Sequence, residues 1–473
     1  MKLAVGWFPE IYKMFTGAGR FGPSGRHKMI ATDCVRAMLN YHIQSTFRRS
    51  NWETVAYGLA FGSVTTILFS IALSQLLLGL AFATLVLSGR DLKFPPVKTP
   101  LLLFGALTVI SLLLSGDPVH GLPQIRKFYV FLTLPVIYSA FRSMQDVRLT
   151  VVTWSAIAFL SALRSGAQYV HRYHLAEEQY AYNYGFFLDG RFTGFASHWM
   201  TFGGEQMVVL LMLLALLLFC PARRRLRWLG FSVAVVLWAS VVLGLTRSIF
   251  LLGLPAGCFY LLWKWKRPVA FILPALIILE LLFGPVQVRE RVVSAIRPHE
   301  ELDSNAHRIL TRKVGWAMIH AHPWFGVGPE QVGRQFTRYL PEGTPQPLPK
   351  GFYGHLHNIY LQFGAERGIP ALGVLLWFIG RVLRDFYRGA HSSGNNSPQA
   401  QFALHGGIAV TIAILLEGCF EHNLGDSEIL TLFLTVVAFG YIALERVPFE
   451  RQLVSVIASR QPDQLHAVPM SAS

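Results

Sequence analysis

Runs of roughly 20 apolar residues recur along the chain, separated by short polar segments. A helix needs about 20 such residues to cross a hydrocarbon core, and a helix satisfies its own backbone hydrogen bonds there. The pattern therefore predicts an all-α polytopic integral membrane protein with about twelve transmembrane helices. The expected spans are 54–72, 73–89, 99–115, 122–141, 148–170, 198–219, 227–245, 248–263, 268–284, 368–387, 402–420 and 428–445.

These spans divide the chain into five parts, one of which is a long loop. A loop of this length marks either function or disorder. Helical patterns from His307 to His320 and from Gln331 to Tyr339, joined by the turn signal HPWFGVGPE, favour an ordered, partly helical loop. The parts are 1–53 (basic N-terminal tail), 54–284 (transmembrane helices 1–9), 285–367 (the large loop), 368–445 (transmembrane helices 10–12) and 446–473 (C-terminal tail).

Positive charge indicates how the spans are oriented. The chain is 53% hydrophobic and only 14% charged, yet its formal net charge is +16. In a soluble protein that charge would favour a nucleic-acid partner, but here most Lys and Arg residues fall in alternate loops, as they do in cytoplasmic loops. We therefore expect no nucleic-acid partner and both termini in the cytoplasm. The segments 171–197, 246–247, 285–367 and 421–428 would face the other side.

Two arginines on that outer side are candidates for binding an anion. Arg247, in VVLGLTRSIFLLGLP, lies between two apolar spans, where an unpaired charge is costly and points to function. The alternative is that Arg247 snorkels to the interface and meets lipid phosphate. Arg191, in DGRFTGFASH, precedes a span; its alternatives are a salt bridge with Asp189 or a solvated loop charge. Together the two guanidinium groups would form a bidentate clamp suited to phosphate.

The stretch GHLHNIYLQFGAERGIP holds two histidines, His355 and His357, just before a predicted span. The pattern predicts a helix that opens near His357 and closes at Gly368. The positive end of a helix dipole favours neutral imidazole, which is the form that a general base needs. Two other roles stay open: a metal site with Glu366 or His320 as further ligands, and purely structural hydrogen bonding. The outer segments contain no Asp-x-Asp pair of hard oxygen ligands, which disfavours a metal.

Four motifs in this order resemble the O-antigen ligases, which share a superfamily with the O-antigen polymerases. The resemblance covers most of the chain and implies a GT-C-like fold with one large periplasmic loop. It also implies a bacterial inner-membrane enzyme, without metal or cofactor, that transfers a polysaccharide from undecaprenyl diphosphate to a sugar hydroxyl of the lipid A-core. Membrane lipids would surround both substrates. The motifs are RFTGF at 191–195, LTRSIFLLG at 245–253, HPWFGVGPEQ at 322–331 and HLHNIYLQFGAERGIP at 355–370.

The resemblance also implies roles for single residues. His357 matches the family's essential histidine and would deprotonate the acceptor hydroxyl. Arg191 and Arg247 match the arginines that hold the diphosphate, where fixed guanidinium groups can stabilise the leaving group in place of a metal. Arg312 is a further candidate for a phosphate contact, although its i, i+4 spacing from Arg308 is by itself typical of a solvated helix face. The supporting residues are His355, Asn358 and Tyr360.

Three other functions compete with this interpretation. An O-antigen polymerase uses the same donor with a second lipid-linked repeat as the acceptor; the motif HNIYLQFGAERG after a single long loop favours the ligase. An oligosaccharyltransferase that modifies protein would usually carry a large extra C-terminal domain. A transporter or flippase would place charges near mid-membrane and show repeated halves, whereas the candidates here gather on one side.

Overall fold

The computed structural model describes the whole chain except residues 1–50, 90–91, 179–183, 298–304, 393–396 and 461–473. The described residues form helices and connecting segments, without a β-strand among them, which confirms the all-α prediction. The earlier helices are α4 (Asn51–Thr66), α5 (Ile71–Leu87), α6 (Lys98–Leu114), α7 (Pro118–Phe131), α8 (Thr133–Ala140), α9 (Met144–Glu178), α10 (Tyr184–Asp189), α11 (Trp199–Phe219) and α12 (Arg224–Leu243). The later ones are η1 (Ser248–Gly253), α13 (Leu254–Trp265), α14 (Arg267–Ala270), α15 (Ile272–Phe283), α16 (Val286–Val293), α17 (Asn305–Ala321), α18 (Val332–Gln335), η2 (Phe336–Tyr339), α19 (Ile359–His391), α20 (Pro398–Glu417), η4 (Asn423–Gly425) and α21 (Ser427–Arg460).

The helices have the length and apolar character of a membrane protein. Within the described ranges, six helical segments are long and apolar enough to cross a membrane, namely α9, α11, α12, the joined η1 and α13, α20 and the Ser427–Glu445 part of α21. Shorter apolar helices cover Ile71–Leu87, Lys98–Leu114 and Arg267–Leu279. Every expected span coincides with helix, and the total of about twelve crossings remains a prediction.

The buried centre of the bundle is formed by α11, α20 and α21. Between 72% and 83% of the apolar stretches of these three helices is buried, against 28% for α12, which is therefore an outer helix. Two boundaries differ most from the expectation: α9 continues to Glu178 inside the expected 171–197 loop, and α21 continues to Arg460 inside the expected C-terminal tail. Both helices continue into sequence with polar and charged residues, HRYHLAEE at 171–178 and RVPFERQLVSVIASR at 446–460, so the end of the apolar run does not mark the end of the helix.

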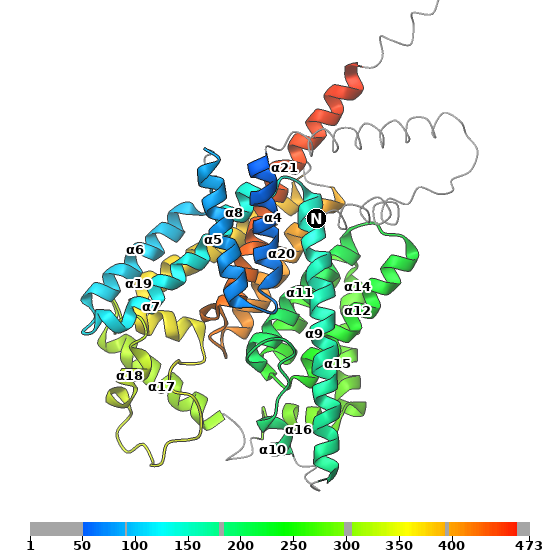
Figure 1. The fold of residues 1–473 in the computed structure, drawn as a ribbon. Coiled ribbons are helices and arrows are strands. Elements are labelled where there is room, and N and C mark those ends of the chain that lie inside the picture. The colour runs from blue at the N-terminus through cyan, green and yellow to red at the C-terminus, as the bar shows by residue number, and fades with distance from the viewer. Residues whose placement is uncertain (1–50, 90–91, 179–183, 298–304, 393–396, 461–473) are drawn as a thin grey trace, which may run out of the picture.

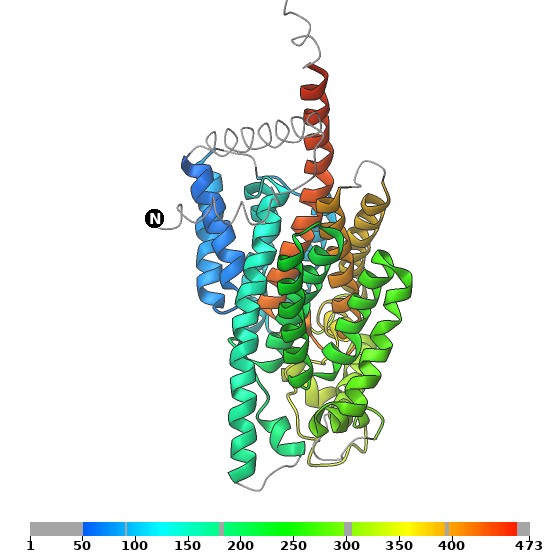
Figure 2. The same ribbon diagram turned by 90° about the vertical axis from the view of Figure 1, so that its right-hand side faces the viewer.

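Helices of the large loop lie together with α10 at one end of the bundle (Figure 1). The C-terminal part of α21 projects from the opposite end, as both views show (Figures 1 and 2). The two helical patterns expected inside the loop correspond to α17 and to the α18 and η2 pair, so the loop is partly helical as predicted.

The loop is fixed to the bundle at a break inside α19. Gly368 has φ +82° and ψ 168°, so the first part of α19 ends there, as the sequence predicted. The carbonyl groups that a helix end leaves without partners need other donors. The HPWFGVGPEQ motif supplies them, because Val327 N donates to Ala365 O (2.8 Å) and Gly328 N donates to Glu366 O (3.0 Å).

Candidate active site

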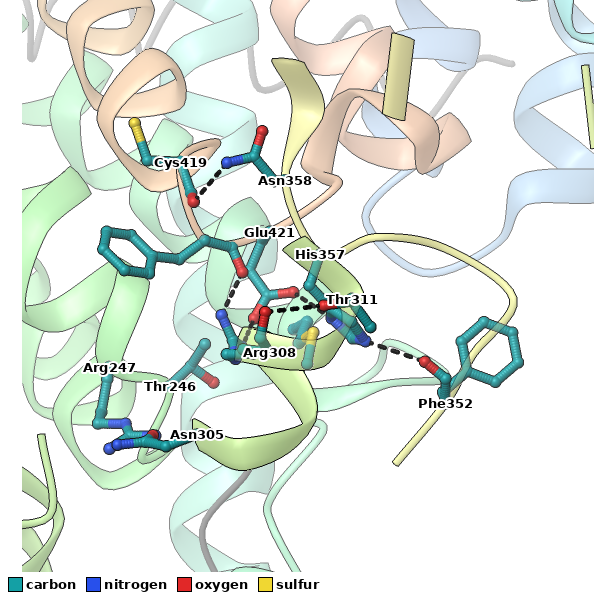
Figure 3. Close-up of polar contacts among 12 residues, drawn as sticks. Thr246, Arg247, Asn305, Arg308, Thr311, Phe352, His357, Asn358, Cys419 and Glu421 are labelled. Atoms are coloured by element: carbon teal, nitrogen blue, oxygen red, sulfur yellow. Dashed lines mark hydrogen bonds and ion pairs between the residues drawn. The ribbon is translucent and has the colours of Figure 1, made fainter. Parts of the chain in front are cut away.

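A cavity of about 1020 Å³ lies among α11, η1, α16, α17 and the link from α20 to α21. Its walls include the three predicted arginines, Arg191, Arg247 and Arg312, together with His355 and His357. Residues from distant parts of the sequence therefore meet around one space. Figure 3 shows the central part of this arrangement.

His357 is held between two hydrogen-bond acceptors. Its Nδ1 lies 3.2 Å from Glu421 Oε2, and its Nε2 lies 3.3 Å from the carbonyl oxygen of Phe352 (Figure 3). Its backbone has φ +49°, which is uncommon outside glycine and often marks residues held for function. The helix opens one residue later than predicted: Asn358 is the N-cap of α19, and its side chain accepts from Leu361 N (2.9 Å). Asparagine is a strongly preferred N-cap, and histidine is not.

The partner of His357, Glu421, was not among the predicted residues. Its side chain is 3% exposed, and it also accepts from the guanidinium of Arg308, which donates as well to the Phe420 carbonyl. Burial by itself raises the pKa of Glu421, but the charge of Arg308 and the hydrogen bond with His357 outweigh it and lower the pKa to about 2. Glu421 is therefore a carboxylate at neutral pH. The interpretation of Arg308 as part of a solvated face was wrong, since its side chain is only 18% exposed.

Three further histidines surround His357, and all are kept neutral. Burial, and then the nearby His357, lower the pKa of His355 to about 3 and that of His307 to about 4. Burial lowers the pKa of His422 well below its usual range. His355 supports its neighbour directly, because its Nδ1 accepts from His357 N (3.3 Å) and the two rings lie 4.1 Å apart. In this group His357 is the one that contacts a carboxylate.

Arg247 lies in the tight turn between α12 and the π-helix η1. Its Nη1 donates to Ser294 O (2.8 Å), and its Nη2 donates to Asn305 Oδ1 (2.5 Å). The turn itself is held by Arg291, whose Nε donates to Leu245 O (2.9 Å), and Leu245 has φ +53°. The end of α16 and the start of α17 thus fix the direction of the Arg247 side chain at the cavity wall.

Arg191 lies in the segment between α10 and α11. Its guanidinium carbon is 4.2 Å from the centre of the Trp199 ring, and its Nε donates to Leu188 O (3.2 Å). These contacts replace the Asp189 salt bridge considered as an alternative. The stacked, planar guanidinium is held against the cavity wall in a way that lysine could not reproduce.

Arg312 occupies the next turn of α17 after Arg308. Its Nη2 donates to Cys419 O (3.4 Å), and its guanidinium carbon lies 4.9 Å from the centre of the Phe420 ring. Arg312 therefore faces the end of α20 and the cavity.

The remaining predicted residues hold the scaffold and do not line the cavity. Asn358 Nδ2 donates to Cys419 O (2.8 Å), and the Tyr360 hydroxyl donates to Leu415 O (2.8 Å). Both contacts fix α19 to α20. Glu366, proposed as an alternative metal ligand, is instead bonded to Gln362 (2.9 Å) and Arg367 (2.6 Å).

Residues 237–376 match the Wzy_C family model, described as O-antigen ligase. This part of the chain is similar to the O-antigen ligase family. No curated protein matches the chain. Members of the family are membrane enzymes of the glycosyltransferase type that act in lipopolysaccharide assembly on lipid-linked polysaccharides.

The part of the chain that matches the O-antigen ligase family contains most of the predicted site. Arg247, Arg312, His355 and His357 lie inside residues 237–376. Arg191 and Glu421 lie outside that range, and the fold brings both to the same cavity. The acidic segment EHNLGDSE at 421–428 was the one sequence signal for Glu421, because it places three carboxylates between two apolar runs.

Proposed function

We propose that this protein is an O-antigen ligase: a metal-independent, inverting glycosyltransferase that moves O-antigen polysaccharide from undecaprenyl diphosphate to the lipid A-core. The observation that supports it best is the convergence of Arg191, Arg247 and Arg312 with a carboxylate-bound histidine around one cavity. The site would lie on the periplasmic side of the inner membrane, where both lipid substrates are found.

The contacts of His357 suit a general base. Glu421 and the Phe352 carbonyl can both only accept, but the charged carboxylate is the stronger acceptor, so the proton on the neutral ring belongs on Nδ1, and Nε2 keeps its lone pair. Nε2 takes the proton of the acceptor hydroxyl as the hydroxyl oxygen forms its bond to the anomeric carbon. The ring then carries a positive charge, with Glu421 on one side and the Phe352 carbonyl as acceptor on the other. Both contacts are stronger with the charged ring than with the neutral one.

The arginines suit the leaving group. As the new glycosidic bond forms, the bond between the anomeric carbon and the diphosphate oxygen breaks, and both electrons go to that oxygen. Permanently charged guanidinium groups that are already held in place stabilise this growing charge without reorganising. Arg247 is oriented by Ser294 and Asn305, and Arg191 by Trp199, so each is fixed before the substrate arrives. Attack from the side of the base, opposite the diphosphate, inverts the anomeric centre.

Transfer can be tested with purified protein, undecaprenyl-diphosphate-linked polysaccharide and rough lipopolysaccharide, which has a lipid A-core but no O-antigen. The proposal expects product in the presence of EDTA and a loss of about 100-fold or more in His357→Ala, the usual contribution of a general base. Full activity in His357→Ala would refute the base assignment, and a requirement for added metal would refute metal independence.

The same reaction distinguishes the rival functions. A polymerase would lengthen the donor when rough lipopolysaccharide is left out, whereas a ligase would give no product. A flippase would move the lipid-linked donor across proteoliposomes without changing its mass. Either result from the wild-type protein would replace the ligase proposal.

A further inference from the structure

The cavity carries its positive and negative charges on different elements. Its arginines come from the segment before α11, the turn before η1, and the helices α16 and α17. Its carboxylates all come from the end of α20, the link that follows and the start of α21; they are Glu417, Glu421, Asp426 and Glu428. Glu421 serves His357 and Arg308. Glu417 accepts from Asn423 Nδ2 (2.6 Å). Diphosphate has no reason to approach Asp426 and Glu428, because like charges repel.

Hydroxyl groups lie beside these carboxylates. The Thr201 hydroxyl donates to Asp426 Oδ2 (3.2 Å). Ser248 lines the same cavity and is 5% exposed, and within the described parts of the chain its Oγ has no hydrogen-bond partner. A buried hydroxyl without a partner is unfavourable and calls for an explanation, of which a bound ligand is one.

The backbone brings these residues together at one place. A Cβ on Gly203 would lie 2.6 Å from Ile249 Cδ1, and one on Gly204 would lie 2.7 Å from Ile429 Cδ1. The start of α11 is therefore in direct contact with both η1 and the start of α21. We call the four residues Thr201, Ser248, Asp426 and Glu428 the hydroxyl-binding face.

The chemical groups on the hydroxyl-binding face indicate that its ligand is a sugar. Carboxylates accept hydrogen bonds, while serine and threonine hydroxyls both donate and accept, and sugar hydroxyls also do both. The side chain of Phe352 lines the same cavity and offers an apolar surface for the ring face of a sugar. A divalent cation fits less well, because no group of three or more His, Cys, Asp and Glu residues in the described ranges is arranged to hold a metal ion.

We infer that the hydroxyl-binding face binds the acceptor saccharide and presents its reactive hydroxyl to His357, while the arginines bind the donor diphosphate. This inference rests on the proposed transferase function. It adds that the two substrates are recognised by different residues, and that the acceptor contacts come from α11, η1 and α21. Asp426 lies on the same link as Glu421, so a sugar bound there is close to the base.

Initial rates of the purified full-length protein test the assignment. The concentration of rough lipopolysaccharide is varied while the donor is saturating. The concentration of the donor is then varied while rough lipopolysaccharide is saturating. Asp426→Asn is expected to raise KM for the acceptor about tenfold or more, and Ser248→Ala about threefold to tenfold, the usual effects of a lost charged and a lost neutral hydrogen bond. KM for the donor stays within about twofold. Matched controls are Ser240→Ala, a serine also 5% exposed but outside the cavity, and Asp385→Asn on α19.

The outcomes separate this inference from the proposed function. If the wild-type protein transfers polysaccharide but both cavity variants keep the wild-type acceptor KM, the hydroxyl-binding face is wrong and the transferase proposal stands. A parallel rise in donor KM would also overturn it. An acceptor KM that rises when EDTA is added to the wild-type protein would assign the carboxylates to a cation instead. If the wild-type protein transfers no polysaccharide, the proposed function itself is refuted. Thermal unfolding in detergent shows that each variant is folded, and Ser248→Ala removes only one oxygen atom.

Discussion

Replacing Glu421 with glutamine tests the pairing of His357 with its carboxylate. Glutamine has nearly the same shape and keeps an oxygen that can face Arg308 or His357, but it removes the charge. The two side chains are 9% and 3% exposed, so water screens their interaction little. We expect Glu421→Gln to lower kcat and to leave the KM values for both substrates nearly unchanged, because the charge matters most when the ring becomes an imidazolium.

The size of the effect follows from the contact. A buried hydrogen bond to a charged group contributes about 1.5–3 kcal/mol, which corresponds to a fall in kcat of roughly 10- to 150-fold. The pKa of Glu421 is lowered from its usual 4.5 to about 2, so its stabilising contribution is complete above the usual value and is lost only as the pH falls toward 2. The carboxylate is therefore charged throughout the range from about pH 5 to 9. Without it the imidazolium is disfavoured, so the acidic limb of the rate profile of Glu421→Gln should move to lower pH.

A double-mutant cycle separates this role from a merely structural one. Rates are measured for Glu421→Gln, for His357→Ala and for the double variant. If the carboxylate acts through the histidine, Glu421→Gln costs little once His357 is gone. An equal loss in both backgrounds would refute the reasoning. Arg308→Gln combined with Glu421→Gln removes both charges, and its thermal unfolding shows whether an unpaired Arg308 alone disturbs the fold.

Three further changes test how the site is held. Asn305→Ala removes the acceptor 2.5 Å from Arg247 Nη2, so KM for the donor should rise about threefold to tenfold in the same initial-rate assay. Gly368→Ala would place a Cβ 2.2 Å from Trp324 O at φ +82°, and thermal unfolding in detergent should show a loss of about 1–3 kcal/mol. Tyr360→Phe removes the bond to the Leu415 carbonyl, so stability should fall by about 1 kcal/mol with kcat within twofold, whereas a tenfold loss of kcat would put Tyr360 in the reaction.

The sequence alone predicted those structural features that depend on a single segment of the chain. Apolar runs located the helices, because a membrane helix satisfies its own backbone and needs no partner to be recognised. Arg247 stood out because a charge between two apolar spans is expensive. The break at Gly368 was visible because glycine, with a proline two residues later, is typical of the end of a helix. The N-cap could have been placed correctly as well, since Asn358 is the better capping residue of the pair His357 and Asn358.

Contacts between distant segments were not predictable in the same way. Glu421 lies 64 residues from His357, and nothing in either segment identifies the other as its partner. Arg308 and Arg312 have the spacing of a solvated helix face, and only the position of α17 against the end of α20 shows that Arg308 forms a buried ion pair. A salt bridge with Asp189 was the alternative to phosphate binding that the sequence left open for Arg191. In the structure the guanidinium of Arg191 stacks on the Trp199 ring.

The end of α20 explains why His357 and Glu421 meet although they belong to different helices. A helix leaves its last carbonyl groups without backbone partners, and that end carries partial negative charge. Three consecutive carbonyls there are bound by the groups that flank His357 and by α17, and Glu421 follows directly after them. Figure 3 shows the bond between Asn358 and Cys419. The pairs are Ile359 N with Gly418 O (2.8 Å), Asn358 Nδ2 with Cys419 O (2.8 Å) and Arg308 with Phe420 O. Because the start of α19 is fixed residue by residue to the end of α20, His357 and Glu421 are set at a defined distance from each other. If His357 is the base that we propose, hydrogen bonds between two helix ends orient it before any substrate binds.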